Sequence, residues 1–481
     1  METIRPSSSF YKIIVLVTAI FSIYIAIINI GVSVYLNSWL YALLIIPVFA
    51  VILFVSAKLD IMPAAFAIMV FIMAFLVKGT FAYFMNTKPV SDFGLFYNYA
   101  VDLVNGKIGL ERYSYFKTWA YQTGPVIYYA GIMKLFGTGL LSLKLVNCFF
   151  MAGSNVLIYL ISRKVSNDLT ARFVALLYLF YPAPYFLTSV LTNQHFAAFM
   201  FLVAIYVLLN ENIGLLFRSV TAGILIAVGN AVRPLGVVII ASIVVWTVLE
   251  IKNKRGKGKV IFSALLIAVY IVVGFGLSAA VRGTGVNTEG LKNNMPLWKF
   301  VVGLNQKSMG QFSYEDENKI FTIKNISERN DKALDTVKER LQIEPYRMLA
   351  FMGIKIGVMW AQPDTLMWSN YEERDGKLVA PEKIKKVEPV VMGIEKMYYV
   401  GIFILLAIGL VRMFGNPRFN SVALLLIIIL LFYFGIHMLI EIQVRYRYFA
   451  MLIVFILAST GTEVLFKPLK NYNKSLKNKW K

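Results

Sequence analysis

Long apolar segments recur along most of the chain and are separated by short polar loops. A helix that crosses the hydrocarbon core of a bilayer needs about 20 mostly apolar residues. Twelve segments meet this requirement and are predicted to be transmembrane helices: 11–34, 38–57, 61–85, 140–162, 170–189, 191–209, 216–233, 235–251, 259–281, 390–412, 418–439 and 446–466. The pattern therefore predicts an all-α, polytopic integral membrane protein.

Two longer segments interrupt this pattern and are predicted to lie on the outer side of the membrane. The first, residues 86–139, contains a shorter apolar run at 124–136 with Tyr and Lys side chains. The second, residues 282–389, carries fifteen of the 26 acidic residues and seventeen Lys and Arg, and is long enough for a small folded module. Its apolar part at 346–360 includes two basic residues. We expect both apolar runs to be interfacial helices rather than spans.

Basic residues mark the opposite side. They cluster at 163–164, 252–259, 412–418 and 467–481. Cytoplasmic loops of membrane proteins are enriched in Lys and Arg, and with twelve spans all four clusters fall on one side. Both termini are therefore predicted to be cytoplasmic.

The resulting domain organisation has five parts. They are an N-terminal pair of transmembrane helices (1–60), a transmembrane core with the external loop 86–139 (61–281), an extracytoplasmic module (282–389), the C-terminal transmembrane helices (390–466) and a basic cytoplasmic tail (467–481).

Composition supports the membrane class. Hydrophobic residues make up 58% of the chain and charged residues 15%, against about 45–50% and about 25% in soluble domains. The formal charge of +22 follows the short loops and the C-terminus, which indicates lipid headgroups rather than nucleic acid as the partner. The single cysteine, Cys148, excludes an intramolecular disulfide. The first apolar segment has no small-residue cleavage site and is expected to be retained as a helix.

Few carboxylates remain near the predicted outer membrane edge. They are Asp92, Asp102, Glu111, Glu395 and Glu441. Asp92 begins the first external loop among aromatic and apolar neighbours, and a partly desolvated carboxylate there is suited to be a general base. The alternative is that Ser91-Asp92 caps the helix that follows. Asp102 is a possible additional site residue.

A second polar cluster lies between the last two predicted spans. Positions four, four and three residues apart would share one face of a helix; they are His437, Glu441, Arg445 and Tyr448. Arg445 or Arg447 would suit a phosphate group, since a guanidinium binds phosphate oxygens in a fork. The alternative is a Glu–Arg ion pair that makes the membrane edge tolerable.

Two outer turns supply further candidates. Arg233-Pro234 joins the seventh and eighth spans, where a guanidinium would bind a lipid phosphate or reach the headgroups. Asn193-Gln194-His195 occupies the turn before it, with Gln194 and His195 as possible additional site residues. No paired histidines, Cys–His spacing or phosphate-binding glycine loop occurs, so no metal site and no nucleotide cofactor are predicted.

Several short motifs, in this order, resemble those of GT-C superfamily glycosyltransferases, in the group that includes protein O-mannosyltransferases and bacterial lipid A sugar transferases. The motifs are Ser91-Asp92, Gln122-Thr123-Gly124-Pro125-Val126-Ile127-Tyr128-Tyr129, Leu135-Phe136-Gly137, Leu143-Lys144-Leu145-Val146-Asn147, Tyr181-Pro182-Ala183-Pro184, Arg233-Pro234, Gly303-Leu304-Asn305 and Arg445-Tyr446-Arg447-Tyr448.

The resemblance implies a function and roles for residues. Enzymes of this superfamily move a sugar from a polyprenyl phosphate to an acceptor hydroxyl, with inversion, at the outer face of the membrane. Asp92 would be the general base, and Arg445 or Arg233 would stabilise the departing lipid phosphate. Many relatives carry a second acid in the turn that reads Thr192-Asn193-Gln194-His195 here, so divalent metal use is left open. The expected partners are the lipid-linked donor, an extracytoplasmic acceptor and the bilayer, in a plasma membrane of bacterial type.

Two other functions stay open at this point. A flippase or transporter of lipid-linked saccharides usually carries polar residues near the bilayer midplane in repeated halves, whereas here they gather at the outer ends and no repeat is visible. A polysaccharide polymerase or ligase would share the large external loops, but it would use a pyrophosphate-linked donor.

Overall fold

The computed structural model describes residues 3–4, 9–85, 87–252, 256–362, 372–374, 377–415 and 419–479. Parts of the predicted basic clusters (253–255, 416–418 and 480–481) lie outside the described residues. The described chain is almost entirely helical. Its strands form two short antiparallel pairs, β1 (Thr3–Ile4) with β4 (Phe419–Asn420) and β2 (Glu372–Arg374) with β3 (Lys377–Val379).

Nine helices of the described chain are long and apolar enough to cross a membrane. They are α1 (Ser9–Tyr35), α2 (Ala42–Lys58, preceded by the 3₁₀ turn η1, Ser38–Tyr41), α3 (Pro63–Phe84), α7 (Leu140–Val165), α11 (Leu215–Val232), α13 (Gly256–Gly283), α19 (Glu382–Gly415), α20 (Ser421–Leu439) and α21 (Tyr448–Lys479, preceded by the 3₁₀ turn η4, Val444–Arg447). The prediction of an all-α, multi-pass membrane protein is confirmed.

The other three predicted spans form shorter helices. Residues 170–189 are divided into α8 (Asp168–Phe180) and α9 (Ala183–Thr188), because Pro182 and Pro184 have no amide hydrogen to continue the first helix. Residues 191–209 form α10 (Gln194–Leu208), and residues 235–251 form α12 (Gly236–Lys252). The helix α10 is largely buried among its neighbours and packs against α7 and α11.

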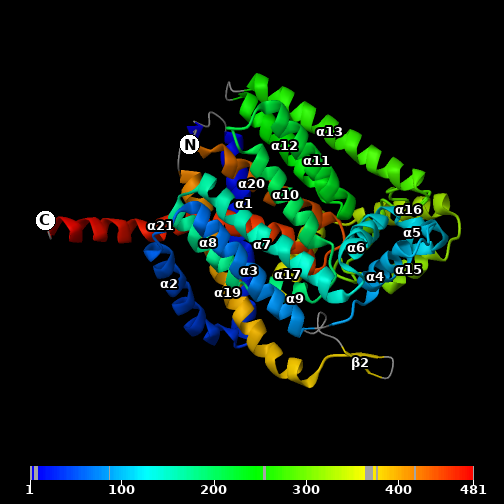
Figure 1. The fold of residues 1–481 in the computed structure, drawn as a ribbon, viewed down its shortest axis with the longest axis horizontal. Coiled ribbons are helices and arrows are strands. Elements are labelled where there is room, and N and C mark those ends of the chain that lie inside the picture. Colours follow the sequence, from blue (N-terminus) through cyan, green and yellow to red (C-terminus); the bar gives the residue numbers. More distant parts are fainter. Residues whose placement is uncertain are drawn as a thin grey trace.

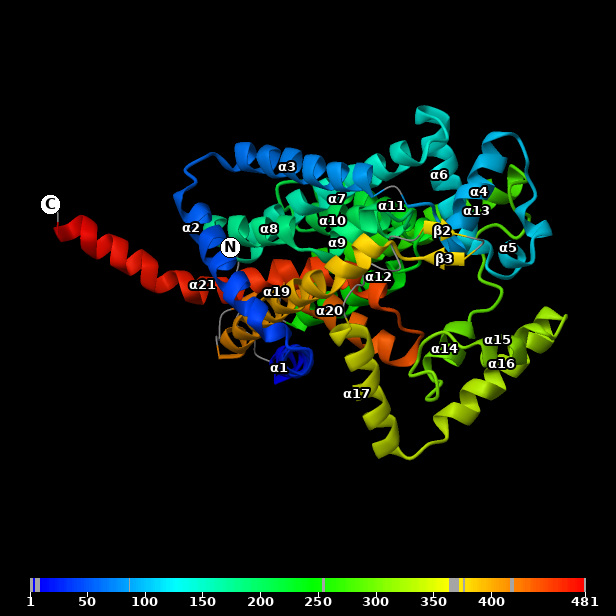
Figure 2. The same cartoon turned by 90° about the horizontal axis from the view of Figure 1, so that it is seen from below.

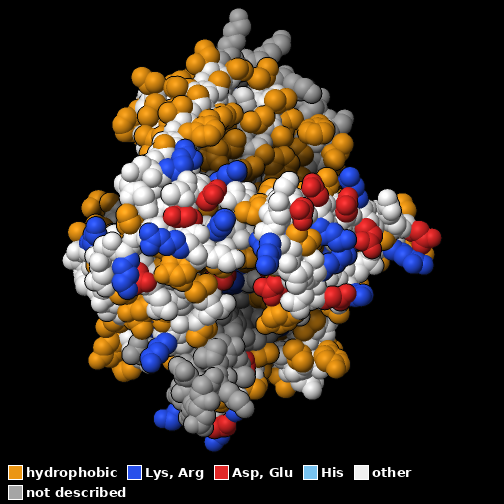
Figure 3. Space-filling model, turned by 90° about the vertical axis from the view of Figure 1, so that its right-hand side faces the viewer, with side chains coloured by type: hydrophobic (Ala, Val, Ile, Leu, Met, Phe, Trp, Pro, Cys, Tyr) orange, Lys and Arg blue, Asp and Glu red, His pale blue; other side chains and the backbone are white. Residues whose placement is uncertain are grey.

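The described ends of the chain lie at one end of the bundle, and most of the short helices of the two segments predicted to be external lie at the other (Figures 1 and 2). These two segments contain α4 (Ser91–Val104), α5 (Ser114–Thr118), α6 (Thr123–Phe136), α14 (Trp298–Gly303), α15 (Tyr314–Phe321), α16 (Ile326–Leu341) and α17 (Pro345–Ala361). The apolar runs predicted as interfacial helices form α6 and α17, of 14 and 17 residues, which are not among the nine long helices. Viewed from this end, Lys, Arg, Asp and Glu side chains gather between hydrophobic surfaces (Figure 3).

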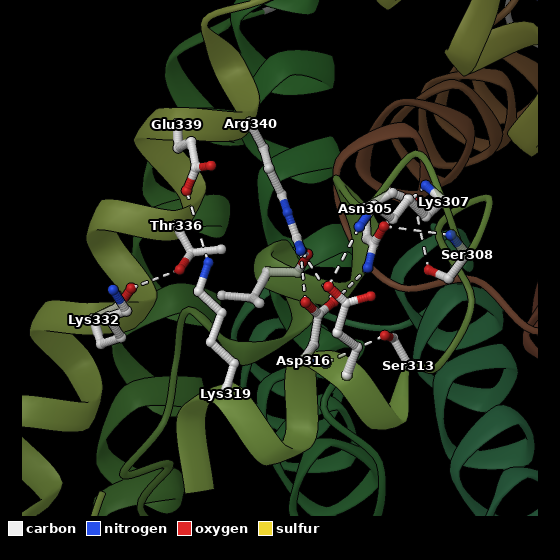
Figure 4. A network of polar contacts seen from close by, with 12 residues as sticks. Asn305, Lys307, Ser308, Ser313, Asp316, Lys319, Lys332, Thr336, Glu339 and Arg340 are labelled. Atoms are coloured by element: carbon white, nitrogen blue, oxygen red, sulfur yellow. Dashed lines mark hydrogen bonds and ion pairs between the residues drawn. The ribbon is translucent and has the colours of Figure 1, made fainter. Parts of the chain in front are cut away.

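The helices α14, α15 and α16 share a small core with residues from other parts of the chain. Trp298, Val301 and Ile320 are buried in it, and Leu439 at the end of α20 packs against it. Behind this core, Arg340 donates to both carboxylate oxygens of Asp316, at 2.6 and 3.0 Å, and Asn305 donates to the same carboxylate at 2.7 Å (Figure 4). A bidentate arginine–carboxylate pair fixes direction as well as distance, so it holds α15 and α16 in register.

Candidate active site

A cavity of about 930 Å³ lies where α4, the turn before α6 and the external module meet α11, α13 and α20. Among its described lining residues Asp92 is the one carboxylate, against five Lys and Arg. The polar side chains that line it are Asp92, Tyr121, Gln122, Asn193, Asn230, Arg233, Ser278, Arg282, Lys292, Asn293, Lys299, His437, Arg445 and Tyr446. The charge of the described walls is therefore strongly positive, which favours an anionic ligand.

Asp92 lies in the first turn of α4 and faces the cavity. The N-cap of this helix is Val90, which makes no side-chain cap hydrogen bond, so the predicted capping role of Ser91-Asp92 is not observed. Ser91 has a φ of 53°, in the left-handed region that residues other than glycine rarely adopt. Such strain persists where the surroundings impose it, and it is concentrated at functional sites.

Tyr115 of α5 lies near Asp92. Burial, and then the charge of Asp92, raise the pKa of the Tyr115 hydroxyl above its ordinary value, so this hydroxyl keeps its proton at neutral pH and is able to donate to the carboxylate.

The predicted helical stripe from His437 to Tyr448 is wrong. The helix α20 ends at Leu439, residues 440–443 form an irregular link, and η4 begins at Val444. His437 and Arg445 still line the same cavity, because the link turns the chain back toward it. The polar groups are therefore brought together by tertiary structure rather than by helical spacing.

A series of polar contacts runs along this link and ends at Arg445. Lys299 of α14 pairs with Glu441, Gln443 donates to Glu441 at 2.8 Å, and the Nε of Arg445 donates to Gln443 at 2.6 Å. The guanidinium of Arg445 also lies over the ring of Phe93, 4.8 Å from its centroid, beside Asp92. These contacts hold the guanidinium in the cavity that Asp92 also lines.

The ionisation of the Lys299–Glu441 pair follows from its surroundings. Burial alone would raise the pKa of Glu441, but the charge of Lys299 and hydrogen bonds from Lys299 and Gln443 bring it below its ordinary value. Burial would likewise lower the pKa of Lys299, but Tyr446, Glu441 and Tyr121 raise it above its ordinary value. Both groups are therefore charged at neutral pH.

Arg233 lies at the end of α11 on another wall. Its Nη1 donates to Asn193 at 3.1 Å, and its guanidinium lies 5.2 Å from the centroid of the Tyr446 ring. The predicted Arg233 site and the Arg445 site thus meet at Tyr446. His437 donates from Nδ1 to the carbonyl of Tyr433 at 2.8 Å, which leaves Nε2 for another contact.

A close backbone approach positions Tyr121 and Gln122 in the cavity. A Cβ added at Gly124 would lie 1.8 Å from the carbonyl oxygen of Ala231, so only glycine lets the start of α6 reach the end of α11. This explains the glycine of the motif Gln122-Thr123-Gly124-Pro125 in physical terms.

The external module holds the link by its backbone. The amides of Glu441 and Ile442 donate to the carbonyls of Lys299 and Gly310, at 2.7 and 2.9 Å. The ammonium of Lys355, on α17, donates to three carbonyls, those of Gly303, Met438 and Ile440, at 2.6 to 2.9 Å. Lys355 therefore joins the end of α14 to the end of α20.

Gly303 is required at this junction, since an added Cβ would lie 2.1 Å from the carbonyl carbon of Ile440. We expect Gly303→Ala to lower the free energy of unfolding by about 1–3 kcal/mol, as overpacking does, and to reduce activity because the link must shift. Thermal unfolding of the purified protein measures the change. Gly357→Ala is the control, because a Cβ there meets nothing within 4 Å. Equal stability of the two variants would contradict this account of the junction.

The other predicted site residues lie outside the cavity lining. Asp102 pairs with Lys107 at 2.8 Å, on the last turns of α4. Arg447 is buried, pairs with Glu395 at 3.2 Å and donates to the carbonyl of Gln362 at 2.7 Å, which ties η4 to the end of α17 and to the interior of α19.

The remaining predicted site residues, Gln194, His195 and Tyr448, are buried together away from the cavity. His195 donates from Nε2 to the carbonyl of Leu187 at 3.1 Å and accepts the hydroxyl of Tyr448 at Nδ1, at 3.0 Å. Gln194 is buried beside it in the first turn of α10. The structure therefore brings Asp92, Arg233, His437 and Arg445 into one cavity, places Glu441 directly behind Arg445, and leaves Asp102, Gln194, His195, Arg447 and Tyr448 elsewhere.

Lys299 and Tyr121 also line the cavity, but neither was predicted from the sequence as a site residue. Lys299 is a single charge inside the apolar run 297–304, a pattern that signals a buried or paired lysine. Tyr121 has no comparable signal, because aromatic residues are abundant throughout the chain.

One side of the cavity is apolar and continues onto the outer surface of the bundle. Tyr270, Ile271 and Phe275 of α13 and Val237 of α12 line it, and the side chains of Val237 and Phe275 are 65% and 71% exposed. The cavity thus combines a positively charged part with an apolar wall that is exposed on the outside of the bundle.

Among the described residues no group of three His, Cys, Asp or Glu comes together as a metal site would require. Whether the reaction uses a divalent metal stays a prediction to be tested.

Comparisons with known proteins give structural neighbours only. No protein-family model matches the sequence, and neither does any curated protein. Two solved structures of the Archaeoglobus fulgidus oligosaccharyltransferase, one of AglB with an inhibitory peptide and a dolichol-phosphate and one tethered to an acceptor peptide, are 13% and 12% identical, with TM-scores of 0.47 and 0.48. They cover 86% and 84% of this chain, which spans about half of theirs (51% and 50%). ArnT from Cupriavidus metallidurans, bound to undecaprenyl phosphate, is 12% identical with a TM-score of 0.35, over 84% of this chain and 78% of its own.

At such identities and TM-scores, the chemistry must be argued from the residues of this chain.

Proposed function

We propose that the protein is a membrane glycosyltransferase of GT-C type, which moves a sugar from a polyprenyl-phosphate donor to a hydroxyl of an extracytoplasmic acceptor. The observation that carries the proposal is the cavity itself. Its described lining places one carboxylate, Asp92, among five cations, and it has an apolar wall whose residues Val237 and Phe275 are exposed on the outside of the bundle. A donor with an anionic phosphate, a polar sugar and a long apolar tail matches these three parts.

Asp92 is suited to accept the proton of the acceptor hydroxyl. As the proton moves to the carboxylate, the acceptor oxygen forms a bond to the anomeric carbon, and the bond from that carbon to the phosphate oxygen breaks. The electron pair of that bond leaves with the phosphate. A single displacement of this kind inverts the configuration, and it needs one base and no second carboxylate as nucleophile.

The departing phosphate gains negative charge, and the cavity supplies cations for it. Arg445 is held in the cavity by Gln443 and Phe93, and Arg233 lies on the other side of Tyr446 in the same lining. Fixed guanidinium groups stabilise a developing oxyanion without reorganising during the reaction. The apolar wall of α12 and α13 would receive the prenyl chain. These roles complete the proposal for substrate and mechanism.

Purified protein in lipid vesicles, given a radiolabelled polyprenyl-phosphate sugar and cell-envelope extract as acceptor, tests the function. We expect donor consumption with release of polyprenyl phosphate. Consumption of a pyrophosphate-linked saccharide instead would favour a polymerase or ligase. Movement of the intact donor across the vesicle membrane without consumption would favour a flippase.

Lys299 is predicted to determine the acid limb of the pH–rate profile, because it lowers the pKa of Glu441. In Lys299→Met the charge that lowers the pKa of Glu441 is gone, whereas burial still raises it. The contribution of the pair is present above the pKa of an unfolded glutamate and is lost as the pH falls through the lowered folded value. We therefore expect the acid limb of the pH–rate profile to move to higher pH in the variant.

The matched control is Lys307→Met, a lysine of the same module whose side chain is 80% exposed. It should keep the wild-type profile. An unchanged acid limb in an active Lys299→Met enzyme would show that Glu441 does not position Arg445.

A further inference from the structure

A second cavity, of about 410 Å³, lies at the opposite end of the bundle from the candidate active site. The helices α11, α13 and α20 contribute to both cavities with opposite ends. On α11, for example, Arg218 near the start lines the second cavity and Arg233 after its end lines the first. By the distribution of basic loops, this second cavity faces the cytoplasmic leaflet.

The described lining of this cavity holds four cations, and two of them have carboxylate partners. Arg163 pairs with Asp168 at 2.9 Å, and Lys259 pairs with the buried Glu250. Lys164 and Arg218 are different. Their closest hydrogen bonds are to the carbonyls at the end of α10, at 3.4 Å in each case, and no described carboxylate lies within ion-pair distance of either.

The guanidinium of Arg218 lies 5.6 Å from the centroid of the Phe262 ring, which lines the same cavity. Asn212, Asn420 and Ser421 add neutral polar groups to the same walls. The described lining contains one carboxylate, Glu211, which is exposed.

We propose that this cavity binds a phosphate group, supplied by the headgroup of an anionic membrane lipid. A phosphate group would pair with the charges of Arg218 and Lys164, since guanidinium and ammonium groups bind phosphate well. The lipid is favoured over a soluble phosphate by the flanking surface. Leu216, Phe217 and Ile261 are 66%, 62% and 64% exposed beside the cavity and would contact the acyl chains. The inference depends neither on Asp92 nor on sugar transfer.

Thermal unfolding of the purified full chain in detergent tests the proposal. Phosphatidylglycerol is expected to raise the Tm of the wild type saturably, whereas phosphatidylcholine is not. The midpoint of this rise should need about tenfold more phosphatidylglycerol or more in the double variant Lys164→Gln, Arg218→Gln. The control is Lys58→Gln. Lys58 is an exposed lysine at the end of α2, on the same side of the bundle. The chain at this end is held independently of Lys58, because Arg172 donates to the carbonyl of the next residue, Leu59. It should keep the wild-type midpoint.

A second pair of variants avoids the buried groups. Asn212 is exposed at the rim of the cavity, so Asn212→Glu and Asn212→Lys should fold normally and shift the midpoint in opposite directions, upward and downward.

Inorganic phosphate, added without lipid, distinguishes a lipid headgroup from soluble phosphate as the source of the bound phosphate group. A rise in Tm of equal size with the same dependence on these variants would keep the phosphate site but overturn the lipid as its occupant. If neither phosphatidylglycerol nor phosphate distinguishes the wild type from Asn212→Glu, the site itself is overturned.

Discussion

Sugar transfer is expected to fall by about 10²–10⁴-fold when Asp92 is replaced by Asn, because the amide has the shape of the carboxylate but cannot take the acceptor proton. Binding of the polyprenyl-phosphate donor should be retained, since the cations that face the phosphate are untouched. Single-turnover transfer of a radiolabelled donor in vesicles, with donor binding measured separately, gives both quantities.

Asp102→Asn is the matched control for this experiment. Asp102 lies on the same helix, α4, but pairs with Lys107 and does not line the cavity. It should keep near wild-type transfer. Transfer by Asp92→Asn at the rate of Asp102→Asn would remove Asp92 from the role of base.

The second large effect is predicted at Arg445. Replacement by Gln removes the guanidinium beside the departing phosphate, and we expect transfer to fall by about 10²–10³-fold, as for other preorganised oxyanion donors. Arg445→Lys should recover part of the rate, because an ammonium keeps the charge but not the forked geometry. If Arg445→Gln transferred sugar at the wild-type rate, Arg445 would not stabilise the departing phosphate, and Arg233 would remain as its ligand.

Arg347→Gln controls for the loss of an arginine. Arg347 lies on α17, has a 65% exposed side chain and pairs with Glu344. Its replacement should leave both the rate and donor binding unchanged. The wild-type pH profile should also be kept.

The sequence placed Asp92, Arg233 and Arg445 among the candidate site residues, and all three line the cavity. Asp92 was found because acidic residues are scarce near the outer edge of the predicted spans, and Arg233 because a guanidinium in a tight membrane-edge turn is costly without a partner. Both conclusions depend on what the bilayer tolerates. They needed no knowledge of packing.

The predicted helical stripe failed because tertiary contacts ended α20 early. Residues 437–448 contain no proline or glycine that would signal a break. The break comes instead from Lys355, which binds the carbonyls of Met438 and Ile440, and from the pairing of the Glu441 amide with Lys299. These partners lie more than eighty residues away in the sequence, so no local pattern contains them.

Lys299 was overlooked for a related reason. Its importance comes from Glu441, which is 142 positions away in the sequence, and from the fold that joins α14 to the link. The shorter helices α8 and α9 could have been anticipated, because Pro182 and Pro184 are visible in the sequence. A long apolar segment was nevertheless given more weight than its prolines.

The three hydrogen bonds that Lys355 donates to carbonyls of α14, the end of α20 and the link have a consequence for protein engineering. Grafting residues 282–389 from a related enzyme would appear to be a simple exchange of an external loop that changes acceptor choice. It would in fact divide a single structural unit between two parents, with the carbonyls of Lys299 and Gly310 from one and the amides of Glu441 and Ile442 from the other. A functional chimera must therefore carry residues 438–447 together with the module. The smallest part of the chain that can be exchanged between related proteins therefore consists of two segments that are separated in sequence.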